Sequence, residues 1–308
     1  MKKIIIRANP FKKDEGDIGK GLYVIKKLLG FFLVYISSMI IGEVIVVFGL
    51  NLAGYDFLQG EMPNDDIMML IKYYGFSIHL IITILYCKFI ENRDVESMGI
   101  IKTNIVKSYF LGAGIGMMLL GIIFTLCLIS GSIFYNGENN DISVILILLY
   151  LGGFIIQGAM EEVMCRGFLM NSLRCKVSIQ IAILISSFMF TFPHLLTLFQ
   201  FSILVRIIGI VNLLLFSIMV SLLMIKYNNI WVSCAVHSVW NFVLAIIIGI
   251  NVSGSNKTAS VFNFNVNESM KLLSGGQYGF EAGLICTAVL SLFIIMLLRK
   301  VKGEKYGI

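Results

Sequence analysis

The chain has 308 residues, of which 58% are hydrophobic and only 14% are charged. Soluble globular domains carry about a quarter charged residues, so this composition excludes a soluble protein with a large core. The net charge of +6 does not indicate nucleic-acid binding, because the basic residues cluster at the ends of apolar blocks, where they act as topology signals.

The apolar residues fall in eight blocks, each close to the roughly 20 residues that a bilayer requires. The blocks span residues 28–50, 67–90, 108–130, 143–160, 178–194, 203–225, 229–250 and 282–298. This pattern predicts an all-α fold, a polytopic membrane helix bundle of about eight transmembrane helices. We divide the chain into a cytoplasmic N-terminal arm (1–27), three N-terminal membrane helices (28–142), a core of five membrane helices (143–298) and a cytoplasmic tail (299–308).

The connections between the blocks alternate in charge. Basic residues mark the N-terminal arm, the second, fourth and sixth connections and the tail, whereas the first and third connections carry only acidic residues. By the positive-inside rule both termini face the cytoplasm of a multi-pass protein in the cell membrane, with lipid as a partner. The seventh connection, 251–281, is long and of mixed charge, and the abundance of Ile, Lys and Asn favours a bacterial source.

Two further features concern packing. Gly112, Gly114 and Gly116 in the segment GAGIG predict the close approach of a neighbouring helix. The six cysteines are scattered without a CxxC pair, so we expect buried thiols and neither disulfides nor a cysteine zinc site.

The stretch GAMEEVMCRGFLMN, residues 158–171, brings charges into an apolar chain. Glu162 and Arg166 are four residues apart on one helix face and can pair. Glu161 points about 100° away from Glu162, which leaves it without a helical partner and free to face a cavity. A charge at bilayer depth costs about 2.5–3.5 kcal/mol, so such groups line bundle interiors or polar cavities. The alternative is that this segment lies at the cytoplasmic surface, with its charges merely solvated.

The chain contains only three histidines. His194 ends the fifth block in FMFTFPHLL. His237 and Asn241 lie four residues apart, on one face of the seventh block, in WVSCAVHSVWN. His79 lies alone in the second block, where a hydrogen-bonded helix contact is the simpler interpretation. Two membrane histidines with an asparagine and an unpaired glutamate favour chemistry over packing.

These groups can meet only if the fourth helix continues beyond residue 160. With a turn near Arg174–Val177, Glu161 lies about 16 residues before it and His194 about 17 residues after it. At about 1.5 Å per residue, the two side chains then share one level of an antiparallel hairpin. His237 follows the next cytoplasmic turn by about eight residues. We therefore expect His237 and Asn241 to converge with this pair a little inside the cytoplasmic leaflet.

The segments EEVMCR, FTFPH and HSVWN resemble, in order and spacing, the EExxxR, FxxxH and HxxxN motifs of the CPBP intramembrane proteases. This is the family of the CAAX prenyl proteases and of the bacterial Abi and bacteriocin-processing proteins. The similarity covers roughly residues 143–298, includes SGGQYGFEAGL before the last block, and extends to RDVESMGI upstream. It implies an intramembrane endopeptidase that cleaves a membrane-associated peptide, such as a CAAX-like C-terminus, a bacteriocin leader or a signalling peptide.

The resemblance implies six site residues, namely Glu161, Glu162, Arg166, His194, His237 and Asn241. Peptide hydrolysis requires an activated water, a stabilised oxyanion and a proton for the leaving amine. In this scheme Glu161 is the general base and His194 helps to hold the water. His237 and Asn241 donate to the oxyanion, and the Glu–Arg pair of the first motif fixes the helix.

The sequence leaves alternatives open both for the cofactor and for the function. Two histidines and a carboxylate can bind Zn²⁺ with water in the fourth position. The chain has no HExxH motif and its ligands would come from three separate helices, so no cofactor is favoured, and zinc stays possible. No serine or cysteine lies beside a base in these motifs, which sets nucleophilic catalysis aside. The alternative functions are a non-proteolytic immunity or regulatory partner of another membrane complex, and a transporter with a proton relay.

Overall fold

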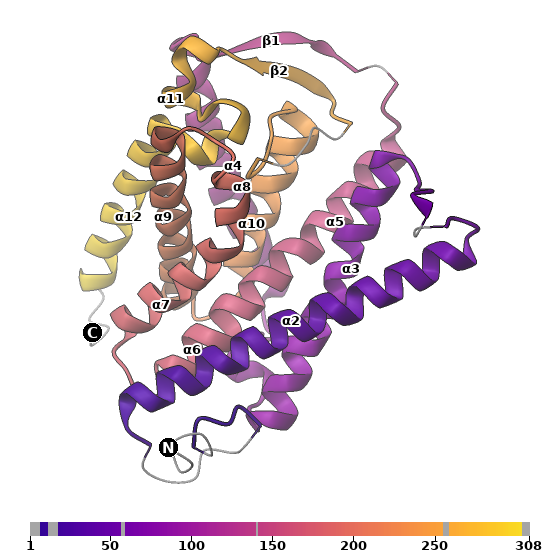
Figure 1. Ribbon diagram of the computed structural model, residues 1–308. Helices are drawn as coiled ribbons and strands as arrows, with labels where there is room; N and C mark the ends of the chain where they lie inside the picture. The colour runs from indigo at the N-terminus through magenta and orange to yellow at the C-terminus, as the bar shows by residue number, and fades with distance from the viewer. Residues whose placement is uncertain (1–6, 12–17, 57–58, 140, 255–258, 304–308) are drawn as a thin grey trace.

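The computed structural model describes residues 7–11, 18–56, 59–139, 141–254 and 259–303. Long helices form a bundle, and a two-stranded sheet lies across one end of it (Figure 1). Within these ranges, seven helices are long and apolar enough to cross a membrane, and Leu284–Arg299 is a shorter apolar helix. The predicted helical membrane bundle is confirmed, with this small sheet added. Parts of the predicted N-terminal arm (1–6 and 12–17) and tail (304–308) lie outside the described residues.

The helical segments comprise long helices, which follow the predicted blocks closely, and short segments that join or extend them. In the first half they are α2 (Lys20–Leu52), α3 (Asp65–Leu85) with its π-helical extension η2 (Tyr86–Ile90), η3 (Val95–Met98), α4 (Ile105–Ile129), and α5 (Val144–Glu162) continued by η4 (Val163–Met170) and α6 (Asn171–Leu173). In the second half they are α7 (Ile179–Thr191), η5 (Phe192–His194), α8 (Leu195–Leu198), α9 (Ile203–Tyr227), α10 (Trp231–Phe242), η6 (Val243–Ile248), α11 (Lys271–Ser274) and α12 (Leu284–Gly303). The fourth span runs from Val144 to Leu173. The predicted extension of this helix and its turn near residues 174–177 are therefore confirmed.

Polar side chains fix where the helices of the core begin. Ser143 accepts a hydrogen bond from the backbone N–H of Leu146 at the start of α5, and Ser178 accepts one from Ile181 at the start of α7. Such caps satisfy backbone donors that have no partner inside the helix, and each stabilises a helix by about 1 kcal/mol. Asn228 ends α9 in the left-handed conformation (φ 50°), which turns the chain directly into α10.

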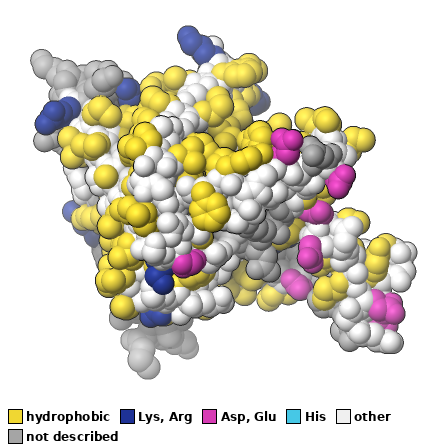
Figure 2. Space-filling model, turned by 90° about the horizontal axis from the view of Figure 1, so that it is seen from above, with side chains coloured by type: hydrophobic (Ala, Val, Ile, Leu, Met, Phe, Trp, Pro, Cys, Tyr) yellow, Lys and Arg dark blue, Asp and Glu magenta, His cyan; other side chains and the backbone are white. Residues whose placement is uncertain are grey.

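The strands β1 (Ile133–Glu138) and β2 (Phe262–Val266) pair antiparallel, with Ile133 opposite Val266. They join the third and seventh connections over one end of the bundle, while the start of α2 and the end of α12 lie toward the other (Figure 1). Figure 2 views the end that carries the strands, and acidic side chains gather over one half of it. Which of the two ends faces the cytoplasm stays a prediction from the charge pattern.

Helix α10 packs against both α4 and α5. A Cβ atom at Gly112 of α4 would collide with the carbonyl oxygen of Val232, and one at Gly116 would lie 3.1 Å from the carbonyl oxygen of Val236. These two glycines therefore permit the close approach that the sequence predicts. Gly114 meets nothing within 4 Å, so its predicted packing role is wrong, because it lies on another face of α4.

We expect Gly112→Ala to destabilise the protein by about 1–3 kcal/mol, because the added methyl group must push α4 and α10 apart. Gly114→Ala changes the same residue type in the same helix without a neighbour, and we expect it to be neutral or stabilising by up to about 1 kcal/mol. Thermal unfolding of both variants in one detergent measures the difference. Equal unfolding temperatures for the two variants would contradict the contact.

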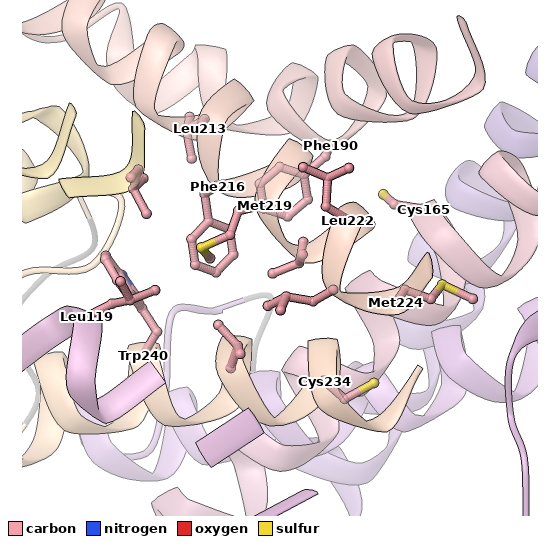
Figure 3. Packing of buried hydrophobic residues seen from close by; sticks show 14 of the residues in the cluster. Leu119, Cys165, Phe190, Leu213, Phe216, Met219, Leu222, Met224, Cys234 and Trp240 are labelled. Atoms are coloured by element: carbon pink, nitrogen blue, oxygen red, sulfur yellow. The ribbon is translucent and has the colours of Figure 1, made fainter. Parts of the chain in front are cut away.

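Aromatic side chains of α7, α9 and α10 form a packed layer next to His237. Figure 3 shows Phe190, Phe216 and Trp240 in this layer. The Phe216 ring lies 5.3 Å from the His237 ring and 5.4 Å from the Trp240 ring, centroid to centroid. All six cysteines are free thiols, as predicted, although Cys175 is exposed and the other five are buried.

Candidate active site

A cavity of about 430 Å³ lies between the N-terminal helices α2 and α3 and the core helices α5, α7, α9 and α10. Four of the six predicted site residues line it, namely Glu161, His194, His237 and Asn241. The common depth in the bundle that the helix lengths predict for Glu161 and His194 therefore agrees with the structure. The other two, Glu162 and Arg166, are fully buried behind the cavity wall.

Glu162 links two of the motifs. Its Oε1 atom accepts a hydrogen bond from Arg166 Nη1 at 3.1 Å, which is the ion pair predicted from their spacing. The same oxygen lies 2.9 Å from His237 Nδ1, a contact between helices that the sequence did not indicate. A carboxylate at Nδ1 holds the proton there and fixes the ring orientation. His237 Nε2 is then directed at Glu161, whose Oε2 lies 3.6 Å away.

Arg166 is anchored on all sides. Its Nη2 donates to the carbonyl oxygen (3.1 Å) and the hydroxyl oxygen (2.7 Å) of Ser217, and Nε donates to the hydroxyl of Ser221 (3.4 Å). The guanidinium lies 4.7 Å from the centre of the Phe190 ring. Phe190, the aromatic residue of the second motif, thus packs against the cation of the first motif. These hydrogen bonds and the ring contact hold the Arg166 guanidinium in one position.

A glycine brings the helices of the first and third motifs together. Gly158 lies one turn before Glu162, and a Cβ atom there would collide with the hydroxyl oxygen of Ser238 on α10. Only a residue without a side chain allows this approach. It sets the spacing at which His237, the neighbour of Ser238, reaches Glu162.

The segment that resembles the upstream family motif supports the first motif directly. The helix widens into the π-helix η4 immediately after Glu162, and such segments leave backbone groups in unusual positions. Arg93 Nη2 and Nη1 donate to the carbonyl oxygens of Gly167 and Phe168, each at 3.2 Å. Arg93 Nη1 also donates to the hydroxyl of Ser172. This arginine therefore satisfies carbonyl groups of the π-helix and holds it in place.

Glu161 has a helical partner that the sequence analysis missed. Gln157 Nε2 donates to Glu161 Oε1 at 3.2 Å, and Asn241 Nδ2 donates to Gln157 Oε1 at 3.2 Å. The expectation of an unpartnered Glu161 is wrong, because Gln157 lies four residues earlier on the same face. That spacing was the signal that could have identified it. Glu161 Oε2 stays on the cavity side, toward His237.

His194 enters the cavity from the end of α7. Its Nδ1 lies 3.1 Å from the carbonyl oxygen of Phe190, one turn earlier. When Nδ1 donates to this carbonyl, Nε2 is the ring nitrogen available to the cavity. Within the described part of the chain, no hydrogen bond or ion pair joins His194 to Glu161. Both side chains line the cavity.

Glu281 and His79 also line the cavity, and neither was assigned to it from the sequence. Glu281 lies in the seventh connection, just before α12, and burial raises the pKa of its carboxyl group. In the sequence, the feature that could have identified Glu281 is its position as a single acidic residue in the apolar segment GFEAGL. His79 is buried in the cavity wall beside Tyr35, and its Nε2 has no hydrogen-bond partner among the described residues. The hydrogen-bonded contact expected for His79 is therefore not found at that nitrogen.

A zinc site does not fit this arrangement. No group of three His, Cys, Asp or Glu side chains in the described ranges is placed to hold a metal ion. Structural and catalytic zinc sites need at least three protein ligands around one point. We therefore derive no step of the chemistry through a metal.

Comparison with known proteins agrees with the motifs. The family model described as "Type II CAAX prenyl endopeptidase Rce1-like" matches residues 143–243, a range that contains all six predicted site residues. No curated protein and no solved structure matches the chain. Residues 143–243 form a domain of the Rce1-like type II CAAX prenyl endopeptidase family.

Proposed function

We propose that the protein is an intramembrane endopeptidase that hydrolyses a membrane-associated peptide with a water molecule activated by Glu161. The family of the 143–243 domain supports the reaction class. The single observation that carries the proposal is Glu161 Oε2 on the cavity, 3.6 Å from His237 Nε2. Buried contacts fix both side chains from behind, since Gln157 binds the other Glu161 oxygen and Glu162 binds the other His237 nitrogen.

The separation between Glu161 and His237 suits a third atom that contacts both. At 3.6 Å the two atoms are beyond ordinary hydrogen-bond distance, so each keeps capacity for a water or a substrate oxygen. In the proposed step Glu161 removes a proton from water, and the hydroxide attacks the carbonyl carbon of the scissile bond. When the tetrahedral intermediate collapses, the C–N bond breaks and the proton on Glu161 passes to the leaving amine.

The remaining polar groups act on the oxyanion and the water. A protonated His237 lies between two carboxylates, which stabilise its charge, and its Nε2–H can donate to the developing oxyanion. The Asn241 amide has two N–H groups, and Gln157 uses one of them. The second is available to the same oxyanion. His194 Nε2 faces the water from the other wall of the cavity.

The rest of the cavity wall favours an apolar substrate. Four methionines line it together with several aromatic rings, and these are Met39, Met160, Met164 and Met189. Methionine side chains are flexible and adapt to irregular apolar shapes. An apolar peptide segment or a lipid-modified C-terminus fits this lining.

Comparative peptidomics of cells tests the proposal. Three strains express the wild type, Glu161→Gln, or Glu43→Gln, with equal protein levels in the membrane. Glu43 is a matched control, because it is a glutamate in a membrane helix that is exposed and does not line the cavity. We expect peptide products in the wild type and in Glu43→Gln that are missing in Glu161→Gln. Identical peptides in all three strains would overturn the protease proposal and favour a non-proteolytic partner.

A further inference from the structure

Glu281 is a cavity carboxylate that the hydrolysis scheme does not use. It belongs to the short 3-10 segment η9 (Phe280–Ala282), directly before α12, and its residue is only 9% exposed. It lines the same cavity as Glu161 and both site histidines. Burial of a carboxylate disfavours its charged form unless a cation or hydrogen-bond donors compensate.

The other buried carboxylates of the bundle have cationic partners. Glu91 pairs with Lys27 at 2.9 Å, and Glu162 pairs with Arg166 at 3.1 Å. Glu281 forms no ion pair with a lysine or arginine in the ranges that the structure describes. Its compensation comes from Ser253, whose backbone N–H and hydroxyl both donate to Oε2, at 2.6 and 2.8 Å. No hydrogen bond to the second oxygen, Oε1, is found among the described residues, and the residue lines the cavity.

The backbone around Glu281 is held rigidly. Gly279 has φ 108°, and a Cβ atom there would collide with the carbonyl oxygen of Asn251. The backbone N–H of Gly254 donates to the carbonyl oxygen of Tyr278 at 2.9 Å, and Asn212 Nδ2 donates to that of Gly283 at 2.9 Å. The seventh connection and α9 thus hold Glu281 from both sides. A fixed carboxylate is suited to recognition, because little entropy is lost when a ligand binds.

Among the described residues, the positive charge near Glu281 comes from histidines that can lose their protons. His194 from η5 and His237 from α10 both favour its ionised form when they are protonated. The nearby Tyr278 and Cys286 supply no positive charge. Lys72 lines the cavity from α3 but is exposed and forms no ion pair with Glu281 in the described chain. A cationic group of the substrate would supply the positive charge that Glu281 lacks and would favour its ionised form.

We propose that Glu281, held by Ser253, forms a subsite for a cationic group of the substrate, the side chain of a lysine or arginine close to the scissile bond. The inference rests on the proposed function and adds a substrate preference to it. A substrate with one basic residue in an otherwise apolar segment satisfies both Glu281 and the apolar lining. A basic group buried against a carboxylate forms a strong charge-assisted hydrogen bond.

Synthetic apolar peptides with a single Lys, or with Met at the same position, test the subsite. The position is scanned along the peptide, and hydrolysis is measured in lipid nanodiscs with the wild type, Glu281→Gln and Glu268→Gln. Glutamine preserves the shape and can still accept the bonds from Ser253. Glu268 is a matched control in the same connection, because within the described residues its side chain accepts a hydrogen bond from Gln277 alone and does not line the cavity.

We expect Glu281→Gln to lower kcat/KM about 10- to 100-fold for the best Lys peptide and less than about threefold for its Met partner. Glu268→Gln leaves both values unchanged. An equal loss for the two peptides would overturn the subsite, since Glu281 would then act through His194 or as a support of the connection. No loss for either peptide would overturn it as well. Arg peptides and peptides with a free or an acetylated N-terminus identify the preferred cation.

A binding measurement separates this inference from the proposed function. Glu161→Gln and the double variant Glu161→Gln/Glu281→Gln bind the Lys and Met peptides without turnover. We expect the Lys peptide to bind about tenfold or more tightly when Glu281 is present, and the Met peptide to bind both variants equally. If the wild type hydrolyses no peptide but this preference persists, the proposed function fails and the subsite stands. If hydrolysis occurs and the preference is absent, only the subsite fails.

Discussion

Replacement of Glu161 by glutamine is expected to lower kcat for peptide hydrolysis by about 10²–10⁴-fold, the usual contribution of a general base. Glutamine has nearly the same shape and can still accept the hydrogen bond from Gln157, but it cannot remove a proton from water. KM should change little, because the apolar lining that would bind the substrate is intact. Steady-state kinetics of the purified protein in nanodiscs gives both constants.

The fold of this variant should be unaffected. Glu161 is partly exposed on the cavity, at 17%, so a neutral amide there leaves no buried charge without a partner. An unchanged unfolding temperature, combined with the loss in kcat, identifies the defect as chemical. If Glu161→Gln keeps more than about a tenth of the wild-type kcat, another group activates the water and the scheme is wrong.

The hairpin that carries the first two motifs could be predicted because it depends on local quantities. Helix rise and the positions of the charged residues fixed the turn near 174–177, and hence the common level of Glu161 and His194. The Glu162–Arg166 pair also follows from spacing within one helix. Both features need no knowledge of how the helices pack around one another.

The contacts that complete the site depend on packing between distant segments. His237 reaches Glu162 because Gly158 lets α10 approach α5, and neither the distance nor the ring orientation is encoded in a local pattern. Glu281 enters the cavity only because the seventh connection folds back over the end of the bundle. A long connection of mixed charge gives no sign of this path. Likewise, the rotation of α4 about its own axis determines which of its glycines face α10, and this rotation depends on packing between the helices.

Removal of the Arg166 cation should have the largest effect on stability. We expect Arg166→Met to destabilise the protein by about 3–5 kcal/mol, because Glu162 would be left as a buried charge with only the titratable His237 in place of its arginine partner. Both side chains are 0% exposed, so water cannot replace the lost interaction. Methionine has a similar length but makes none of the hydrogen bonds to Ser217 and Ser221. Much of a typical stability of 5–15 kcal/mol would be lost.

Two further variants separate the charge effect from the loss of packing. Glu162→Gln/Arg166→Met removes both charges, and glutamine can still accept the hydrogen bond from His237 Nδ1. We therefore expect the double variant to be more stable than Arg166→Met alone, which is the signature of a coupled buried pair. Arg174→Met is the matched control, because Arg174 is exposed at the following turn and should matter by less than about 0.5 kcal/mol. Thermal unfolding and the yield of folded protein in detergent measure all three. If the double variant is no more stable than Arg166→Met, the loss comes from the bonds to α9, and the ion pair with Glu162 does not hold the first motif in place.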